Sequence, residues 1–225
     1  MAEPALEITT EWDSGAIPSH LHAKTLDDFE FVSRRLWSGR PADAFQALER
    51  SVFAPGTYYH IARHEGHCVG FGIRKLVSIS SYTTLYRWMT AILPEYQGFG
   101  FDSSITRLDL TNLACKEGPK LYTTRTRNPL VWFSSQKKCC RVALDMISGN
   151  RDLELVALGE ELASVLFPGN QYDTWNMTSK NVYYDSASYI SLPHHNDEIL
   201  DRAFYSHPAM STERDSPFFV GEFRP

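Results

Sequence analysis

The stretch TAILPEYQGFGFDSS, residues 90–104, decides how the middle of this chain is expected to fold. Its start continues a run rich in aromatic and β-branched side chains, residues 83–93, which predicts a strand. Pro94 ends that strand, because proline has no N–H to give to a sheet. Gly98 and Gly100 follow, and residues 103–117 carry apolar side chains at helical spacing. The stretch therefore predicts a strand, a glycine loop and a helix N-terminus in that order.

A junction of this kind is chemically suited to an anion. The first N–H groups of a helix have no partners within the helix, and the helix dipole adds partial positive charge there. Glycines without Cβ let the backbone approach phosphate oxygens closely. Asp102 lies near this place, where its carboxylate would repel an anion unless the side chain turns away to cap the helix. The loop has neither the G-K-[ST] ending of a Walker loop nor the three glycines of a dinucleotide fingerprint, and an ordinary tight turn is the alternative interpretation.

On both sides of the loop the periodicity alternates between strand and helix patterns, which predicts an α+β fold with helices on the faces of a sheet. The predicted strands are residues 6–12, 57–63, 68–79, 83–93, 120–126, 142–147, 181–190 and 218–223. The predicted helices are one beginning at Thr25, one from Pro41 to Pro55, and residues 103–117, 129–138 and 153–167.

Composition limits the classes of function. The apolar fraction of 43% and charged fraction of 22% are ordinary for a globular protein. A net charge of −5 argues against nucleic acid as the main ligand. The chain has no apolar run long enough to span a membrane and no signal peptide at its start, so we expect no membrane association and a cytoplasmic location. Its four cysteines lack C-x-x-C spacing and are expected to be reduced thiols, with no metal site.

The segment PEYQGFGF, residues 94–101, resembles the cofactor loop of the GNAT (general control non-repressible-related) acyl-CoA N-acyltransferases, whose pattern is Gln/Arg-x-x-Gly-x-Gly/Ala after a strand. Gln97 and Gly100 match this pattern, whereas Asp102 stands where a small residue is expected. Residues 63–71 (RHEGHCVGF) are similar to the family's hairpin, and residues 126–129 (TRNP) to its second cofactor segment. The resemblance covers about residues 57–140.

The resemblance implies a GNAT-like twisted mixed sheet with helices on both faces. Residues 1–145 would form the acyl-CoA-binding core, and residues 146–225 an extension of the same domain or a small second lobe. It also implies acetyl-CoA, or another acyl-CoA, as co-substrate. The residues expected to contact that cofactor are Ala91, Ile92, Gln97, Gly98, Phe99, Gly100, Phe101, Asp102, Ser103 and Asn128.

The implied activity is transfer of an acyl group, acetyl in the first instance, to a primary amine of a small molecule by direct attack on the thioester. A backbone N–H near Ile92 would polarise the carbonyl. Ser135 occupies the place of the family's proton-donating tyrosine, and Tyr86 is a polar residue on the preceding strand; these two are the catalytic predictions. A non-catalytic acyl-CoA-binding or regulatory domain is the alternative, an unrelated α+β binding protein is a third reading, and a homodimer is allowed.

Overall fold

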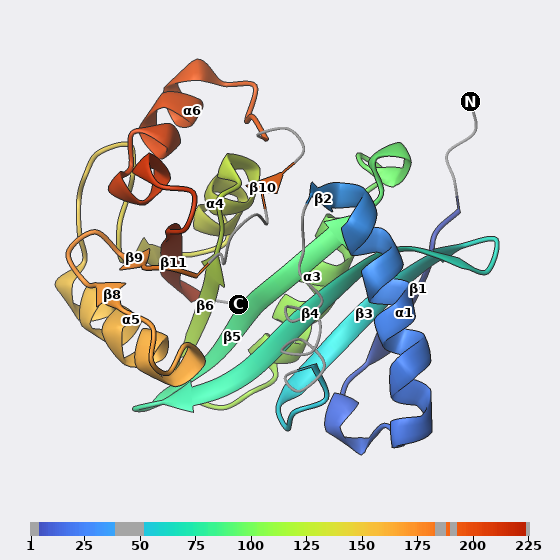
Figure 1. Ribbon diagram of the computed structural model, residues 1–225. Helices are drawn as coiled ribbons and strands as arrows, with labels where there is room; N and C mark the ends of the chain where they lie inside the picture. Colours follow the sequence, from blue (N-terminus) through green and yellow to red (C-terminus); the bar gives the residue numbers. More distant parts are fainter. Residues whose placement is uncertain (1–4, 39–51, 183–187, 190–192, 224–225) are drawn as a thin grey trace. The chain divides into compact units, whose positions relative to one another are not determined.

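The scaffold of the glycine loop is a sheet whose strand order begins with β1 (Glu7–Glu11), β3 (Thr57–His64), β4 (His67–Ile79) and β5 (Tyr82–Ile92). Strands β1 and β3 pair antiparallel with Thr10 opposite His60, and β3 and β4 pair antiparallel with Ile61 opposite Phe71. The structure is a computed structural model that describes residues 5–38, 52–182, 188–189 and 193–223 (Figure 1). The chain divides into two compact units, and most of this sheet belongs to the first. The first unit comprises Met1–Leu76, Arg87–Asn112 and Ala187–Ile190, and the second comprises Val77–Tyr86, Leu113–Ser186 and Ser191–Pro225.

The two units divide the elements as follows, with the far ends of β4, β5 and α3 counted in the second. The first unit contains β1 (Glu7–Glu11), α1 (Ser19–Leu36), β2 (Trp37–Ser38), β3 (Thr57–His64), β4 (His67–Ile79), β5 (Tyr82–Ile92), η2 (Pro94–Tyr96), α3 (Phe101–Ala114) and β10 (Ser188–Tyr189). The second contains β6 (Lys120–Arg125), α4 (Pro129–Gln136), β7 (Arg141–Val142), α5 (Leu153–Leu166), β8 (Tyr172–Asp173), β9 (Thr178–Ser179), α6 (Glu198–Tyr205), η3 (Pro208–Ser211) and β11 (Ser216–Phe223).

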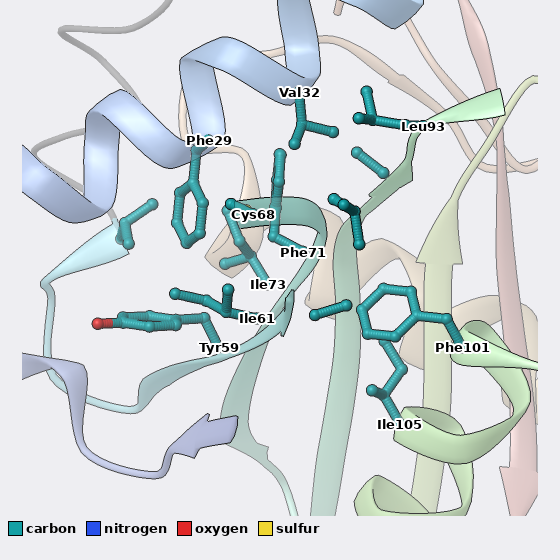
Figure 2. Packing of buried hydrophobic residues seen from close by; sticks show 14 residues of the cluster. Phe29, Val32, Tyr59, Ile61, Cys68, Phe71, Ile73, Leu93, Phe101 and Ile105 are labelled. Carbon is teal, nitrogen blue, oxygen red and sulfur yellow. The ribbon is translucent and has the colours of Figure 1, made fainter. Parts of the chain in front are cut away.

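Helix α1 covers one face of the first unit's sheet. Its buried residues Thr25, Phe29 and Val32 recur at helical spacing, so they form one apolar stripe. Phe29 stacks on Phe71 of β4 with ring centroids 4.3 Å apart, as Figure 2 shows. Burying an aromatic side chain of this size stabilises the fold by roughly 1.5–3 kcal/mol. The core of the first unit therefore begins with the contact between α1 and the central strand β4.

Helix α3 covers the opposite face of the same sheet. Side chains alternate along β4, so Gly72 and Arg74 face away from the side that carries Phe71. A Cβ on Gly72 would lie 2.6 Å from Cδ1 of Ile105 in α3, which shows how closely this helix approaches the strand. Phe101 and Ile105 of α3 are buried (Figure 2). The glycine at position 72 thus sets the distance between α3 and the sheet.

The second unit is built around β11. This strand pairs antiparallel with β6, with Phe219 opposite Thr124, and it also pairs with β7 and β9; β8 pairs with β9. Helices α4 and α5 contact β11. Each of the helices α4, α5 and α6 starts with a capping side chain, from Asn128, Asp152 and Asp197 respectively. Asn and Asp are favoured N-caps, which accounts for where these three helices begin.

Most predicted elements are confirmed, including the strand before the glycine loop and the helix after it, and the α+β class is correct. Three predictions are wrong in extent. The first helix begins at Ser19 rather than Thr25, whose hydroxyl lies within the helix and bonds Leu21 O. The strand expected at 142–147 is only Arg141–Val142, and of the strand expected at 181–190 the described part forms a strand only at Ser188–Tyr189. The helix expected from Pro41 lies largely outside the described residues.

The two compact units do not test the expected boundary at residue 145, which stays a prediction. No helix in the described ranges is long and apolar enough to cross a membrane.

Candidate functional site

The glycine loop leaves the end of β5 through a short, hydrogen-bonded turn. Leu93 N–H donates to Val69 O at 2.9 Å, which fixes the strand end to β4. The side-chain amide of Gln97 donates to Ile92 O at 3.1 Å. A Cβ on Gly70 would lie 2.9 Å from Ala91 O, so the backbones of β4 and β5 meet closely at this end. The predicted residues Ala91, Ile92 and Gln97 are thus brought together, with Gln97 bonded to the strand end.

The two glycines of the loop adopt conformations that other residues disfavour. Gly98 has φ +86° and Gly100 has φ +79°, in the left-handed region where a Cβ is strained. A Cβ added to either glycine would meet no atom of the described residues within 4 Å. The backbone shape therefore requires glycine, and the space over the loop is open to a ligand.

Helix α3 begins directly after this loop. Its first intrahelical bond runs from Ser104 N–H to Gly100 O at 2.9 Å. Within the described part of the chain, the N–H groups of Phe101, Asp102 and Ser103 meet no acceptor. The Phe101 side chain is buried in the core, which anchors the first turn, and Ser103 is exposed. Three open backbone donors at a helix N-terminus form an anion-binding arrangement.

The Asp102 carboxylate does not cap the helix, which corrects one of the two outcomes considered from the sequence. It accepts a hydrogen bond from Nη2 of Arg87 at 2.7 Å. The Arg87 side chain is only 6% exposed, whereas that of Asp102 is 40% exposed. The acidic residue in the loop is therefore paired with a buried cation of β5, and its negative charge is compensated.

A second acidic residue of α3, Asp109, lies in a buried polar cluster on the same face of the sheet. It accepts hydrogen bonds from Arg74 Nε at 2.7 Å, from His60 Nε2 at 2.8 Å and from Tyr58 Oη at 3.0 Å. Burial raises the pKa of the Asp109 carboxyl. The charge of Arg74 and the hydrogen bond from His60 lower this pKa by more than burial raises it, so it lies below its ordinary value. Asp109 is thus a buried carboxylate held by three donors.

Thr90 connects the ion pair of Arg87 and Asp102 to the ion pair of Arg74 and Asp109. Its hydroxyl oxygen accepts from Arg87 Nε at 3.1 Å and from Arg74 Nη1 at 3.1 Å. We call the connected set Asp102, Arg87, Thr90, Arg74 and Asp109 the α3 clamp. Sequence analysis missed the clamp, although the spacing of Asp102 and Asp109 was a usable signal: seven positions are about two helical turns, which places both on one face.

The remaining predicted residues lie in the second unit. Asn128 caps α4, its side-chain oxygen accepting from Leu130 N–H at 2.9 Å. Ser135 is buried and donates its hydroxyl hydrogen to Val131 O at 2.7 Å. Tyr86 is 3% exposed and packs edge-on against Phe167. The catalytic roles of Ser135 and Tyr86, and the cofactor role of Asn128, stay predictions.

Three arginines of the second unit, Arg125, Arg127 and Arg141, contact groups of that unit itself. Nη1 of Arg127 donates to the carbonyls of Thr212 and Asp215 at 2.6 Å each, and to that of Ala209 at 3.3 Å. Arg141 forms ion pairs with Asp152, Glu154 and Glu222. Arg125 lies 4.4 Å from the centre of the Phe167 ring. These three guanidinium groups therefore serve the second unit's own structure.

Solved structures similar to this chain are described as acetyltransferases. Arabidopsis thaliana Naa50 in complex with a bisubstrate analogue is 13% identical, with 96% of this chain and 99% of Naa50 covered and a TM-score of 0.44. A putative GNAT-family acetyltransferase from Desulfovibrio desulfuricans is 15% identical, with 62% and 89% covered and a TM-score of 0.43. The aminoglycoside N-acetyltransferase AAC(6')-Iy in complex with CoA is 19% identical, with 60% and 84% covered and a TM-score of 0.40.

No protein-family model and no curated protein matches the sequence. With TM-scores of 0.40 to 0.44 the likeness carries no argument about function, which is built on the chain's own residues.

Proposed function

We propose that this chain is an acyl-CoA-dependent N-acyltransferase that transfers an acetyl group to a primary amine of a small molecule. The observation that carries the proposal is the anion-binding arrangement at the start of α3. There, Gly98 and Gly100 open the space over the loop, and the N–H groups of residues 101–103 have no acceptor among the described residues. A pyrophosphate, such as that of CoA, is an anion of the size and charge that such a place binds.

The residues present fit this ligand in charge as well as in shape. A carboxylate in the first turn would oppose a pyrophosphate, but Asp102 is paired with Arg87. The exposed hydroxyl of Ser103 supplies a further donor beside the backbone groups. The loop from Gln97 to Ser103 would therefore hold the pyrophosphate, and the end of β5 at Ala91 and Ile92 would hold the acyl-bearing arm.

In the proposed reaction the neutral amine attacks the thioester carbonyl, a C–N bond replaces the C–S bond, and the thiolate gains a proton to leave as CoA. Backbone N–H groups near Ile92 would stabilise the negative charge on the carbonyl oxygen. A serine with an ordinary pKa is a poor proton donor to a thiolate, and the Ser135 hydroxyl already donates to Val131 O. Solvent would therefore take the proton that the amine loses and supply one to the thiolate.

One observation favours a second function, a non-catalytic acyl-CoA-binding domain. Both residues predicted to be catalytic, Tyr86 and Ser135, are buried. Such a domain would keep the glycine loop and bind acyl-CoA without releasing CoA. Amine screening with detection of the CoA thiol separates the two functions, because only the enzyme produces free thiol.

The test is isothermal titration of acetyl-CoA into the wild-type chain, Gly100→Asp and Gly66→Asp. Gly66 is a matched control: its φ is +81°, a Cβ there also meets nothing within 4 Å, and it lies in the turn between β3 and β4. We expect micromolar binding by the wild type and by Gly66→Asp, and loss of binding by Gly100→Asp, because the added carboxylate repels the pyrophosphate. No binding by the wild type, or equal loss in both variants, would refute the proposal.

A further inference from the structure

We infer that Arg87 is a positioning residue that makes the α3 N-terminus able to bind an anion, by holding the Asp102 carboxylate away from it. The inference rests on the proposed function, since it concerns the same site. Arg87 is on β5, and its guanidinium group contacts Asp102 of the helix. Arg87 therefore acts in two ways: it compensates the charge of Asp102, and it helps the α3 clamp to hold helix α3 in position.

The first part of the argument concerns charge. Asp102 is in the first turn of α3, beside the open N–H groups of residues 101–103. Acidic side chains in that position are attracted to the same partial positive charge that attracts a ligand anion. Without a cation, the carboxylate would bond these groups itself or repel a second anion. The 2.7 Å bond from Arg87 draws the carboxylate to β5 and compensates its charge.

The second part concerns geometry. Arg87 is itself fixed, because its Nε donates to Thr90 Oγ1 while its Nη2 donates to Asp102. Thr90 Oγ1 also accepts from Arg74, which bonds Asp109 through Nε. Helix α3 is therefore held at Asp102 and at Asp109, about two turns apart, by arginines from two neighbouring strands. A helix held at two points along its length cannot rotate or slide without breaking one of them.

These two effects predict a rescue. In Arg87→Met the carboxylate of Asp102 loses its partner, and we expect acetyl-CoA binding to weaken by about tenfold or more. In the double variant Arg87→Met, Asp102→Asn the charge is gone, and we expect affinity to return to within about threefold of Asp102→Asn alone. Arg87→Lys keeps the charge but not the fork that reaches both Thr90 and Asp102, so its affinity should lie in between.

A purely structural role of the ion pair predicts a different pattern. Removing either partner would then lower the melting temperature, and the double variant would bind no better than Arg87→Met. Melting temperatures are measured beside the titrations for this reason. Arg63→Met is the control, because it removes an arginine from another partly buried ion pair in the first unit, with Asp28, and should leave affinity unchanged. Absence of rescue, or an Arg87→Met affinity within twofold of wild type, overturns the inference while the proposed function stands.

A second readout separates this failure from failure of the proposed function. Inorganic pyrophosphate is titrated into ¹⁵N-labelled protein, and the amide signals of residues 101–103 are followed. If acetyl-CoA does not bind but pyrophosphate shifts these amides, the proposed function is refuted, and the same rescue is measured with pyrophosphate. If neither ligand shifts them, the inference is overturned together with the function.

Discussion

Replacing Arg74 by methionine is expected to lower the free energy of unfolding by about 3–5 kcal/mol at neutral pH, because it leaves a buried carboxylate without its cation. The side chains of Arg74 and Asp109 are 0% and 1% exposed. Methionine fills part of the volume but donates nothing to Asp109 Oδ2 or to Met89 O, both of which Arg74 now bonds. Domains have total stabilities of about 5–15 kcal/mol, so the loss would be a large fraction of the whole.

The size of this loss should depend on pH in a definite direction. In the wild type the folded-state pKa of Asp109 is lowered, so its contribution is present above the ordinary carboxyl pKa of about 3.9 and is lost as the pH falls through the folded-state pKa. In Arg74→Met the main lowering influence is gone and burial raises the pKa. The folded variant then binds a proton more tightly than the unfolded chain, and acidification should reduce its deficit relative to wild type.

The assay is urea unfolding followed by circular dichroism at about pH 7 and about pH 4.5, with both proteins compared at the same pH so that other titrating groups cancel. Arg34→Met is the control. Its ion pair with Glu30 is on the surface of α1, with the arginine side chain 74% exposed, and such pairs contribute at most about 1 kcal/mol. A deficit of Arg74→Met below about 1 kcal/mol at neutral pH, or one that does not change with pH, would refute the reasoning.

Gly70→Ala should destabilise the chain by about 1–3 kcal/mol, because its Cβ would lie 2.9 Å from the backbone carbonyl oxygen of Ala91; a melting temperature equal to that of the wild type would contradict this. Burial lowers the pKa of His207 to about 4, so the unfolded chain takes up a proton first as the pH falls from 6.5. Stability should then fall by on the order of 3 kcal/mol between pH 6.5 and 4, and this part of the pH dependence should vanish in His207→Phe. Iodoacetamide should label Cys115 and Cys140, which are exposed, well before the other two thiols, and peptide mapping gives the order. Burial raises the pKa of Cys68 to about 11 and that of Cys139 to about 12, so early labelling of either would be a contrary result.

The parts of the fold that sequence analysis predicted are those in which a local signal agrees with the tertiary structure. Pro94 and the two glycines of the loop mark a boundary through backbone sterics alone, and the strand and helix around them are where the pattern predicted. Asn128 and the proline after it likewise mark the start of α4. Helix α6 was missed, although Asp197 caps it by accepting from Ile199 and Leu200 N–H; it is as short as α4, and no proline follows its cap.

The parts that could not be predicted depend on contacts between distant segments. Thr25 has the pattern of a capping residue, but Thr25 lies in the apolar stripe of α1 and is buried, so tertiary packing determines where the helix starts. Asp102 is in helix α3, and its partner Arg87 is on strand β5, fifteen positions away in sequence. No local pattern identifies this partner. Sequence analysis therefore predicted the loop and the strand and helix beside it, whereas the ion pair that compensates the charge of Asp102 could be found only in the structure.

The α3 clamp has a consequence for the entropy of ligand binding. A helix tied to two strands at Asp102 and Asp109 keeps its first turn ordered whether or not a ligand is present, so binding need not restrict it further. Only the segment of Gln97 to Gly100, which has few internal bonds, would lose conformational freedom. Hydrogen exchange should accordingly be slow for the amides after the first turn of α3 and fast for the loop, and a ligand should slow exchange mainly in the loop and the first turn.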